Sequence, residues 1–155
     1  MKLYIPVGIP GSGKSFWIRG KGVVIVSPDA WRIHVYGGYP SKLDKEREKE
    51  VWHLAYQQLS LTLDDYRSVG FDACNITAER RQEVLRYAPP GCTTVAVYFP
   101  TPVDVCIDRQ NGRRNPISID IIENMQARLE EPMEDEGFNL IMQINYEDQQ
   151  HIHTV

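Results

Sequence analysis

Short hydrophobic runs recur along the chain, and each has the composition of a buried β-strand. They are Leu3–Val7, Val23–Val26, Val69–Ala73, Thr94–Phe99 and Leu140–Ile144. Between the runs, hydrophobic positions recur every three or four residues, as they do in a helix with one buried face. Helices are predicted near 14–19, 28–36, 41–66, 77–88, 102–110 and 118–131. Strands that alternate with helices predict an α/β fold, in which helices cover both faces of a parallel sheet.

Residues that favour helix ends support these boundaries. Ser27, Ser41 and Thr77 each precede a helical pattern and have side chains that cap exposed backbone N–H groups. Pro102 suits a first helical turn, where its missing N–H has no cost. We therefore expect the long third helix to begin at Ser41.

Length and composition predict a single globular domain over residues 1–155, with 42% hydrophobic and 25% charged residues. No apolar run approaches the roughly 20 residues of a membrane span. The N-terminus lacks the apolar region of a signal peptide. Three widely spaced cysteines, Cys74, Cys92 and Cys106, form no metal-binding pair and indicate thiols in a reducing compartment. Together these features predict a cytoplasmic protein with no membrane partner.

The net charge of −4 is unevenly distributed along the chain. Residues 120–155 hold nine acidic residues and one arginine, whereas residues 1–119 carry a net charge of +4. A solvated acidic helix end explains the charge of residues 120–155. The basic remainder is compatible with a ligand rich in phosphate.

The stretch from Gly8 to Ser15 reads GIPGSGKS and matches G-x-x-x-x-G-K-[ST], the phosphate-binding P-loop, in full. It follows a predicted strand and opens a predicted helix, as this loop requires. Its backbone N–H groups would surround a polyphosphate, Lys14 would contact the β- and γ-phosphates, and the Ser15 hydroxyl would ligate Mg²⁺. The residues assigned to ATP binding in this loop are Gly8, Pro10, Gly11, Ser12, Gly13, Lys14 and Ser15. The expected cofactors are therefore ATP and Mg²⁺.

The P-loop alone does not distinguish the classes of nucleotide-binding enzyme, nor ATP from GTP. The chain has no Asn-Lys-x-Asp sequence of the kind that GTPases use to read guanine. No hydrophobic run ends in the paired acids of an AAA-type motor. A small kinase is the class that remains favoured.

Asp29 and Arg32 stand at the start of a predicted helix, directly after the run Val23–Val26. We expect this strand to neighbour the P-loop strand. A carboxylate at this place could accept the proton of an attacking hydroxyl, and a cation three residues later could bind a phosphate of the acceptor. An aspartate at a helix start is equally favoured by the helix dipole, and the arginine equally suits a surface ion pair. The spacing alone leaves both interpretations open.

The order of these motifs resembles a known family. GIPGSGKS, VSPDAWR and DACNITAERR, followed by RQNGRRNPISIDII and EEPMEDEGFNLIMQI, resemble the P-loop kinases related to the 5′-kinase domain of bacteriophage polynucleotide kinase and to the zeta-toxin-like small kinases. The resemblance covers nearly the whole chain. It implies a three-layer P-loop NTPase fold with about five parallel strands in the order 2-3-1-4-5. It also implies that Asp29 is the catalytic base and that Arg32 binds the acceptor.

The segment near 109–116 combines arginines with turn-forming residues. Arg109 and Arg113 are four residues apart and would share a face if the preceding helix continues. Phosphoryl transferases use such mobile segments to neutralise charge on the transferred group, although a basic helix end is also favoured by the dipole. The resemblance implies that this segment is the lid over the nucleotide, with Arg109 and Arg113 in ATP binding and catalysis. Arg114 has no clear counterpart in the family.

Asp72 follows a strand and begins the sequence Asp72-Ala73-Cys74-Asn75, where similar proteins often have Asp-Ala-Thr-Asn. Asp72 would hold Mg²⁺ through a water molecule or contact the acceptor, and Asn75 is assigned to the same acceptor site. The alternative is an aspartate that orders the loop through backbone hydrogen bonds. Cys74 replaces the threonine hydroxyl, which puts its hydrogen bond in doubt.

Four further side chains are weaker candidates for the acceptor site. Arg80 and Arg81 either line an acceptor groove or are solvated, and solvation is favoured. Trp31 and Tyr39 either pack or stack on a nucleic-acid base. The alternation His151-Ile152-His153 is typical of a strand edge and has too few neighbouring ligands for a metal site.

Taken together, the residues predict an ATP-dependent kinase, a phosphotransferase with an alcohol group as acceptor. The resemblance implies the 5′-hydroxyl of a polynucleotide, either DNA or RNA. The first alternative is the same chemistry on a small acceptor, such as a sugar, an antibiotic or a nucleotide. The second is a nucleotide-binding module without an acceptor. The oligomeric state stays open.

Overall fold

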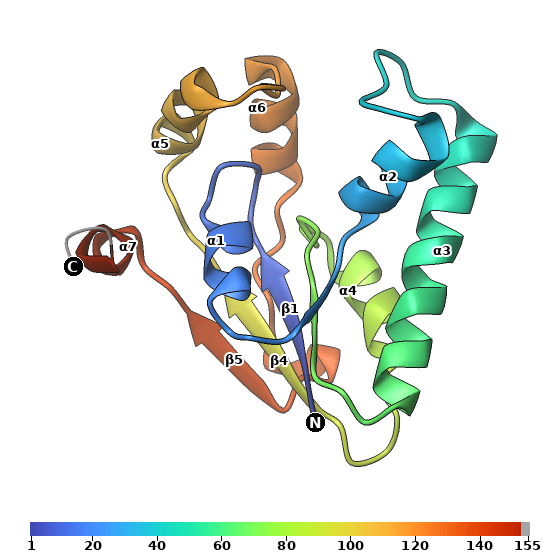
Figure 1. Ribbon diagram of the computed structural model, residues 1–155. Helices are drawn as coiled ribbons and strands as arrows, with labels where there is room; N and C mark the ends of the chain where they lie inside the picture. Colours follow the sequence, from blue (N-terminus) through green and yellow to red (C-terminus); the bar gives the residue numbers. More distant parts are fainter. Residues whose placement is uncertain (153–155) are drawn as a thin grey trace.

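The computed structural model describes residues 1–152, with side chains up to residue 149. Figure 1 shows the arrangement of its elements. The strands are β1 (Lys2–Val7), β2 (Val24–Val26), β3 (Val69–Phe71), β4 (Thr93–Tyr98) and β5 (Leu140–Gln143). The α-helices are α1 (Lys14–Arg19), α2 (Pro28–Tyr36), α3 (Lys45–Asp64), α4 (Ala78–Leu85), α5 (Val103–Asp108), α6 (Ile119–Arg128) and α7 (Tyr146–Ile152). Two short 3₁₀ helices, η1 (Arg109–Gly112) and η2 (Glu134–Glu136), complete the set.

The five strands form one sheet in the order β2-β3-β1-β4-β5, and every neighbouring pair is parallel. This order confirms the predicted fold. It also corrects the expected neighbour of the P-loop strand. β3 lies between β2 and β1, so Asp72, and not Asp29, follows the strand next to β1. Because parallel strands all end at one edge, the segments after β1, β2 and β3 still meet there.

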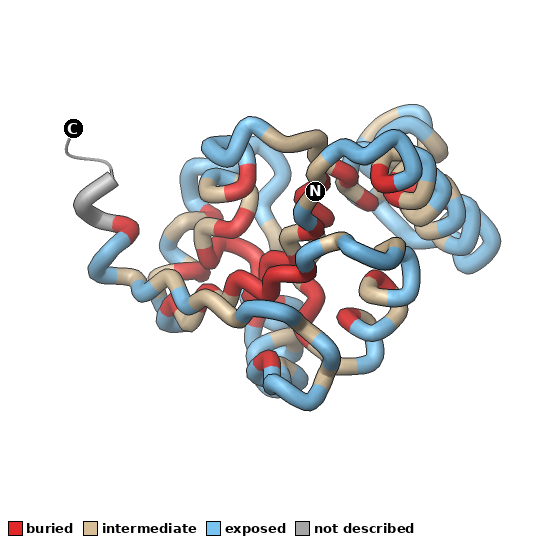
Figure 2. Tube along the Cα trace, turned by 90° about the horizontal axis from the view of Figure 1, so that it is seen from below, coloured by how far each residue is buried: buried red, intermediate tan, exposed pale blue. Residues whose placement is uncertain are grey.

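One face of the sheet packs against α3 and α4. Leu3 and Ile5 of β1 and Phe71 of β3 are fully buried there against Leu59 of α3 and Val84 of α4. The tube in Figure 2 shows buried residues concentrated along the central strands and exposed residues on the outer helices. This face supplies most of the hydrophobic core.

The opposite face packs against α1. Trp17 lies edge-on to Tyr4 of β1 and to Phe99, which follows β4. Ile18 approaches β3 so closely that a Cβ atom on Gly70 would lie 2.2 Å from its Cγ1. The glycine in β3 is therefore required by the close approach of α1, the helix that carries the P-loop lysine and serine. Helices thus cover both faces of the sheet.

Two helix boundaries differ from the sequence prediction. The long helix α3 begins at Lys45 because the Asp44 side chain caps it, accepting a hydrogen bond from the Arg47 backbone N–H at 2.9 Å. Ser41 is therefore not the cap. The sequence prediction missed α7. Residues 151 and 152 belong to this helix and not to the strand edge that their alternation indicated. Residue 153 and the side chains of His151 and His153 lie outside the described residues. Ser27 and Thr77 cap α2 and α4 as expected.

Arg81 has a structural position that its sequence context did not indicate. Its side chain is fully buried and forms a two-bond ion pair with Glu136, at 2.6 and 2.7 Å. It also donates to the backbone carbonyls of Asn75 and Glu130. Arg81 therefore ties α4 to the segment between α6 and β5, and it neither lines a groove nor is solvated.

Within the described residues, every helix is too short or too polar to cross a membrane.

Candidate active site

The P-loop lies at the edge of the sheet where the strands end, between β1 and α1 (Figure 1). Gly11 and Gly13 have φ angles of +87° and +104°, which residues with a Cβ rarely adopt. A Cβ at Gly11 would also lie 2.7 Å from the Cys106 carbonyl, and one at Gly13 would lie 2.8 Å from Gln149 Oε1. These glycines therefore allow both the loop conformation and the close packing of α5 and α7 behind it.

Lys14 and Ser15 occupy the first turn of α1. The Lys14 ammonium is nearly buried and donates to the Ile9 carbonyl at 2.9 Å and to Ser12 Oγ at 3.4 Å. The Ser15 hydroxyl donates to Asp72 Oδ1 at 3.0 Å. A hydroxyl and a carboxylate oxygen thus adjoin each other beside the loop, which is the oxygen donor set that Mg²⁺ prefers.

These two oxygens suit a Mg²⁺ ion that is also held by water and phosphate, and they are too few for a metal site built from protein side chains alone. Among the described residues, no group of three or more histidine, cysteine, aspartate or glutamate side chains is placed to hold a metal ion. Magnesium in nucleotide sites is commonly held by one or two protein oxygens together with water and phosphate oxygens. Ser15 and Asp72 fit that pattern and would hold the ion together with the substrate.

Asp72 connects the P-loop to the end of β2. Its backbone N–H donates to the Val26 carbonyl at 2.8 Å, and the carbonyl of Cys74 accepts a hydrogen bond from Gly8 N–H at 3.0 Å. The segment after β3 therefore lies between the P-loop and the start of α2. Asp29, three residues beyond Val26, lies on the other side of this segment from the P-loop, at the same edge of the sheet.

Asp29 and Arg32 form one end of an ion-pair network with α3. The Asp29 carboxylate is 83% exposed and accepts a hydrogen bond from Arg32 Nη1. Arg32 also binds Glu48 of α3 through two bonds, at 2.9 and 2.8 Å, and Tyr36 donates to the same carboxylate. The hydrogen bonds between them raise the pKa of the Arg32 guanidinium and lower that of Glu48. Arg32 is thus held in place beside an accessible carboxylate.

The predicted lid contains a helical turn and an extended end. Arg109 begins η1 and donates to the Gly11 carbonyl of the P-loop at 2.8 Å. Arg113 follows η1 with an extended backbone and is exposed, as is Arg114. The two predicted arginines therefore do not share a helical face, because the helix ends before Arg113. Of these arginines in the described part of the chain, Arg109 is the one that hydrogen-bonds to the P-loop.

Four residues at this edge were not identified from the sequence. Glu48 accepts a hydrogen bond from Arg32, and the Gln110 side chain donates to the carbonyl of Cys106 in α5. Thr101 donates to the Ser12 carbonyl at 2.8 Å, and Gln149 of α7 contacts both Thr101 and Arg109. Gln110 lies in the predicted lid segment but was not singled out there, and the other three lie outside the motifs, so only the fold shows that these residues meet.

Asn75 is 3% exposed, which makes it a poorly accessible member of the predicted acceptor site. Its amide nitrogen donates to the carbonyls of Pro6, Phe71 and Ala73, and its φ angle is +49°. This environment favours a role in shaping the loop after β3 over a contact with the acceptor. Cys74 lies half-buried beside the cluster of Ile9, Ile76, Cys106 and Ile122, a largely apolar setting.

The remaining acceptor candidates divide between packing and exposure. Trp31 packs on the hydrophobic core and donates from its indole N–H to Gln58 at 2.8 Å. Arg80 pairs with Glu83 and lies 3.9 Å above the Trp52 ring. Tyr39 is 66% exposed in the loop between α2 and α3. Tyr39 is therefore the most exposed of these three side chains.

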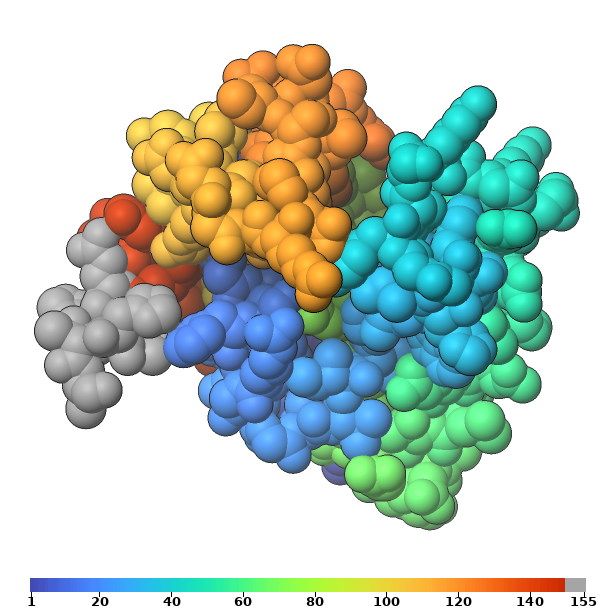
Figure 3. All heavy atoms as spheres, turned by 45° about the horizontal axis from the view of Figure 1, so that its top comes forward, coloured from blue at the N-terminus to red at the C-terminus, as the bar shows by residue number. Residues whose placement is uncertain are grey.

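The surface at this edge is hollowed between two parts of the fold. Figure 3 shows a recess between α6, in orange, and the loop around residues 37–44, in cyan. Green atoms from the middle of the chain form its floor, and the P-loop region, in dark blue, lies beside it. A substrate could approach both the P-loop and the start of α2 from this side.

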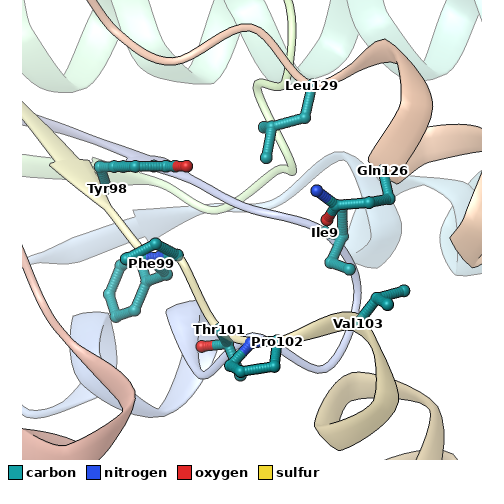
Figure 4. Close-up of a pocket in the computed structure, with 9 residues that line it drawn as sticks. Ile9, Tyr98, Phe99, Thr101, Pro102, Val103, Gln126 and Leu129 are labelled. Atoms are coloured by element: carbon teal, nitrogen blue, oxygen red, sulfur yellow. The ribbon is translucent and has the colours of Figure 1, made fainter.

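A separate cavity of about 190 Å³ lies behind the P-loop. Figure 4 shows Ile9 beside Gln126 of α6, with Tyr98 across the space and Val103 of α5 at its rim. None of the residues from Gly11 to Ser15 lines it. Of the P-loop residues, Ile9 alone borders the cavity, which lies apart from the residues that would hold the phosphates.

Comparison with protein families identifies the group to which this architecture belongs. A family model described as an AAA domain (AAA_33) matches residues 3–132. The chain belongs to this family. The family shares its name with AAA-type motors, but the paired acids of such a motor are not found at the end of a hydrophobic run in this chain. In this AAA domain β3 is followed by a single acid, Asp72, and β4 by Phe99 and Pro100.

Solved structures, two of them of kinases, share the fold of this AAA domain. A sugar kinase from Janibacter sp. HTCC2649 matches with a TM-score of 0.70 and 19% identity, over 99% of this chain and 91% of its own. The Pnkp1/Rnl/Hen1 RNA repair complex contains a chain that matches with a TM-score of 0.71 and 25% identity, over 83% of this chain and 43% of its own. The APS kinase of Mycobacterium tuberculosis, solved with AMPPNP and APS, matches with a TM-score of 0.58, 18% identity and coverage of 98% and 94%. No curated protein matched the chain.

Proposed function

We propose that this AAA domain is an ATP-dependent kinase whose preferred acceptor is the 5′-hydroxyl end of a polynucleotide. One observation carries the proposal: the P-loop, Asp72 and the Asp29–Arg32 pair occupy one edge of the sheet. Asp72 joins them, because its side chain accepts from Ser15 and its backbone N–H donates to Val26 at the end of β2. A nucleotide site and an accessible carboxylate at one edge are the two parts that phosphoryl transfer to a hydroxyl requires.

In the proposed reaction, Asp29 accepts the proton of the acceptor hydroxyl as its oxygen forms a bond to the γ-phosphorus of ATP. The bond from that phosphorus to the β-phosphate bridging oxygen breaks, and ADP leaves. Lys14 and the backbone N–H groups of the P-loop hold the β- and γ-phosphates. Mg²⁺, held by Ser15 and by Asp72 directly or through water, would neutralise charge on the phosphates. Arg32 keeps the Asp29 carboxylate oriented.

The lid arginines have different parts in this proposal. Arg109 already contacts the P-loop carbonyl of Gly11, which supports a role at the nucleotide. Arg113 is exposed at the end of η1, and we assign it to the transferred phosphoryl group only after the segment near 109–116 closes.

The polynucleotide is the first acceptor to test for two reasons. The chain from the Pnkp1/Rnl/Hen1 RNA repair complex has the highest identity, 25%, among the structures compared above. The loop around residues 37–44 carries exposed Tyr39, and the segment that leads from η1 into α6 carries exposed Arg113 and Arg114. An aromatic ring and cations are the groups that hold a single-stranded nucleic acid.

A small hydroxylated acceptor is the second candidate. It is favoured by the pairing of Arg32, because Glu48 already occupies two of its hydrogen-bond donors and reduces the charge available to an acceptor phosphate. The sugar kinase likeness over 99% of the chain agrees with this alternative.

The free thiols are consistent with a cytoplasmic location, which we also propose. Cys74, Cys92 and Cys106 are unpaired, and burial raises the pKa of the Cys106 thiol to about 11. A thiol of this kind stays protonated and unreactive near neutral pH.

The test of the acceptor is phosphate transfer from γ-labelled ATP. Single-stranded DNA and RNA with 5′-hydroxyl ends are compared with a panel of sugars, nucleosides and hydroxylated antibiotics, and oligonucleotides with 5′-phosphate ends serve as the matched control. We expect label on the 5′-hydroxyl strands alone, with a KM that rises as salt is added because phosphate contacts weaken. Label on a small acceptor alone would overturn the polynucleotide proposal and leave the kinase.

A further inference from the structure

Gln149 of α7 is buried against the P-loop although it belongs to no motif. Its side chain is 8% exposed, and its Oε1 lies 2.8 Å from the position of a Cβ atom on Gly13. The helix that carries it follows β5, on the far side of β4 from the P-loop strand. A polar side chain so close to the loop backbone must be matched by hydrogen-bond partners.

The first partner of Gln149 is Arg109. Its Oε1 accepts from both terminal nitrogens of the guanidinium, each at 3.3 Å. One of those nitrogens also donates to the Gly11 carbonyl at 2.8 Å, and the guanidinium lies 5.6 Å from the Tyr146 ring. Gln149 and Tyr146 of α7 thus hold the lid arginine against the P-loop.

The second partner is Thr101, in the loop between β4 and α5. Gln149 Nε2 donates to Thr101 Oγ1 at 3.2 Å, and that hydroxyl donates to the Ser12 carbonyl at 2.8 Å. The C=O and N–H of one trans peptide point in opposite directions. Holding the Ser12 carbonyl on this side therefore aims the Gly13 N–H toward the opposite side of the loop.

The two partners give Gln149 one consistent role. The carbonyls of Gly11 and Ser12 are consecutive in the P-loop. Arg109 donates to the first and Thr101 to the second, and both of these side chains hydrogen-bond to Gln149. We propose that Gln149 is a positioning residue, which fixes Arg109 and the Ser12–Gly13 peptide for binding of a nucleoside triphosphate. The inference rests on the proposed function, because it requires the P-loop to bind such a nucleotide.

The test measures affinity for a fluorescent ATP analogue with Mg²⁺, which needs no acceptor. Gln149→Ala should weaken binding about tenfold, because it removes the hydrogen bonds to the charged Arg109 guanidinium and to Thr101. In an Arg109→Ala background the same substitution should cost about threefold or less, since residues that act through one another are not additive. Gln149→Glu keeps the acceptor for Arg109 but loses the donor to Thr101, so an intermediate loss is expected.

The matched control is Asp148→Ala, which removes an exposed side chain one position earlier in α7 and should leave affinity unchanged. If thermal unfolding shows that Gln149→Ala does not fold, the isosteric Gln149→Glu and Thr101→Val decide the question, and both should weaken binding. Wild-type affinity in the Gln149 variants, or an equal loss in both backgrounds, would overturn this inference. A wild-type protein that binds no nucleotide would instead overturn the proposed function.

Discussion

Ser15 and Asp72 lie 57 residues apart in the chain, yet their side-chain oxygens are 3.0 Å apart at the P-loop. The contact arises because β1 and β3 are parallel neighbours, so the residues that follow them emerge side by side. Near this pair, Lys14 points back to the loop carbonyl of Ile9. The groups proposed to hold the phosphates and the metal ion are therefore already gathered in one place.

Replacing Ser15 tests the proposed magnesium site at this scale. Ser15→Ala removes one of the two oxygens but leaves the P-loop backbone in place, so binding of ATP without Mg²⁺ should change little. The gain in affinity on adding Mg²⁺ should fall about tenfold, as expected for a lost bond to a charged group. Titration with and without the metal measures both values, and a full magnesium gain in the variant would exclude Ser15 as a ligand.

At the residue scale, the sequence predicted the groups that belong to local motifs. The P-loop spacing identified Lys14 and Ser15 because a phosphate-binding loop needs those residue types in that order. It did not identify Arg81 as a buried ion-pair partner, because Glu136 lies 55 residues away and only the fold brings them together. Gln149 was missed for the same reason. Residues whose partners are distant in the chain have no local signal.

At the scale of elements, the ion pairs between α2 and α3 position the proposed base. α2 carries Asp29 and Arg32, and α3 carries Glu48, which binds Arg32 through two hydrogen bonds. The cap of α3 was predicted three residues early, at Ser41, which is an acceptable cap, whereas the Asp44 side chain forms it. Capping preference alone could not choose between two suitable residues in one loop.

The Glu48 contact predicts a pH-dependent contribution to stability. Arg32 lowers the pKa of Glu48 below its ordinary value of 4.5, so the folded state favours the charged carboxylate. This stabilisation is complete above the unfolded pKa and is lost as the pH falls through the lower folded value. At pH 7, Glu48→Gln should reduce the free energy of unfolding by about 1–3 kcal/mol.

Urea unfolding at pH 7 and at several values below 4.5 measures this contribution. The difference between wild type and Glu48→Gln should shrink as the pH falls, while the exposed neighbour Glu50→Gln should cost little at any pH. A difference that stays constant across this range would mean that the charge of Glu48 does not stabilise the fold.

At the scale of the whole molecule, strand order decides which segments can cooperate. The alternation of strands and helices predicted the α/β class, and the family resemblance supplied the order that the structure confirms. Local reasoning nevertheless placed β2 beside β1, because the nearest strands in sequence are commonly neighbours. The insertion of β3 between them brings Asp72 to the P-loop and leaves Asp29 one strand further away. The Asp29 side chain is 83% exposed, so an acceptor can reach its carboxylate.

The most direct measurement of the central claim is the turnover of Asp29→Asn with the accepted hydroxyl substrate. Its control is Asp64→Asn, an exposed aspartate at the far end of α3. Loss of a general base should reduce kcat by about a hundredfold or more, while the affinity for ATP and the turnover of the control remain close to wild type. An Asp29→Asn enzyme with unchanged turnover would contradict the proposal that this carboxylate prepares the acceptor.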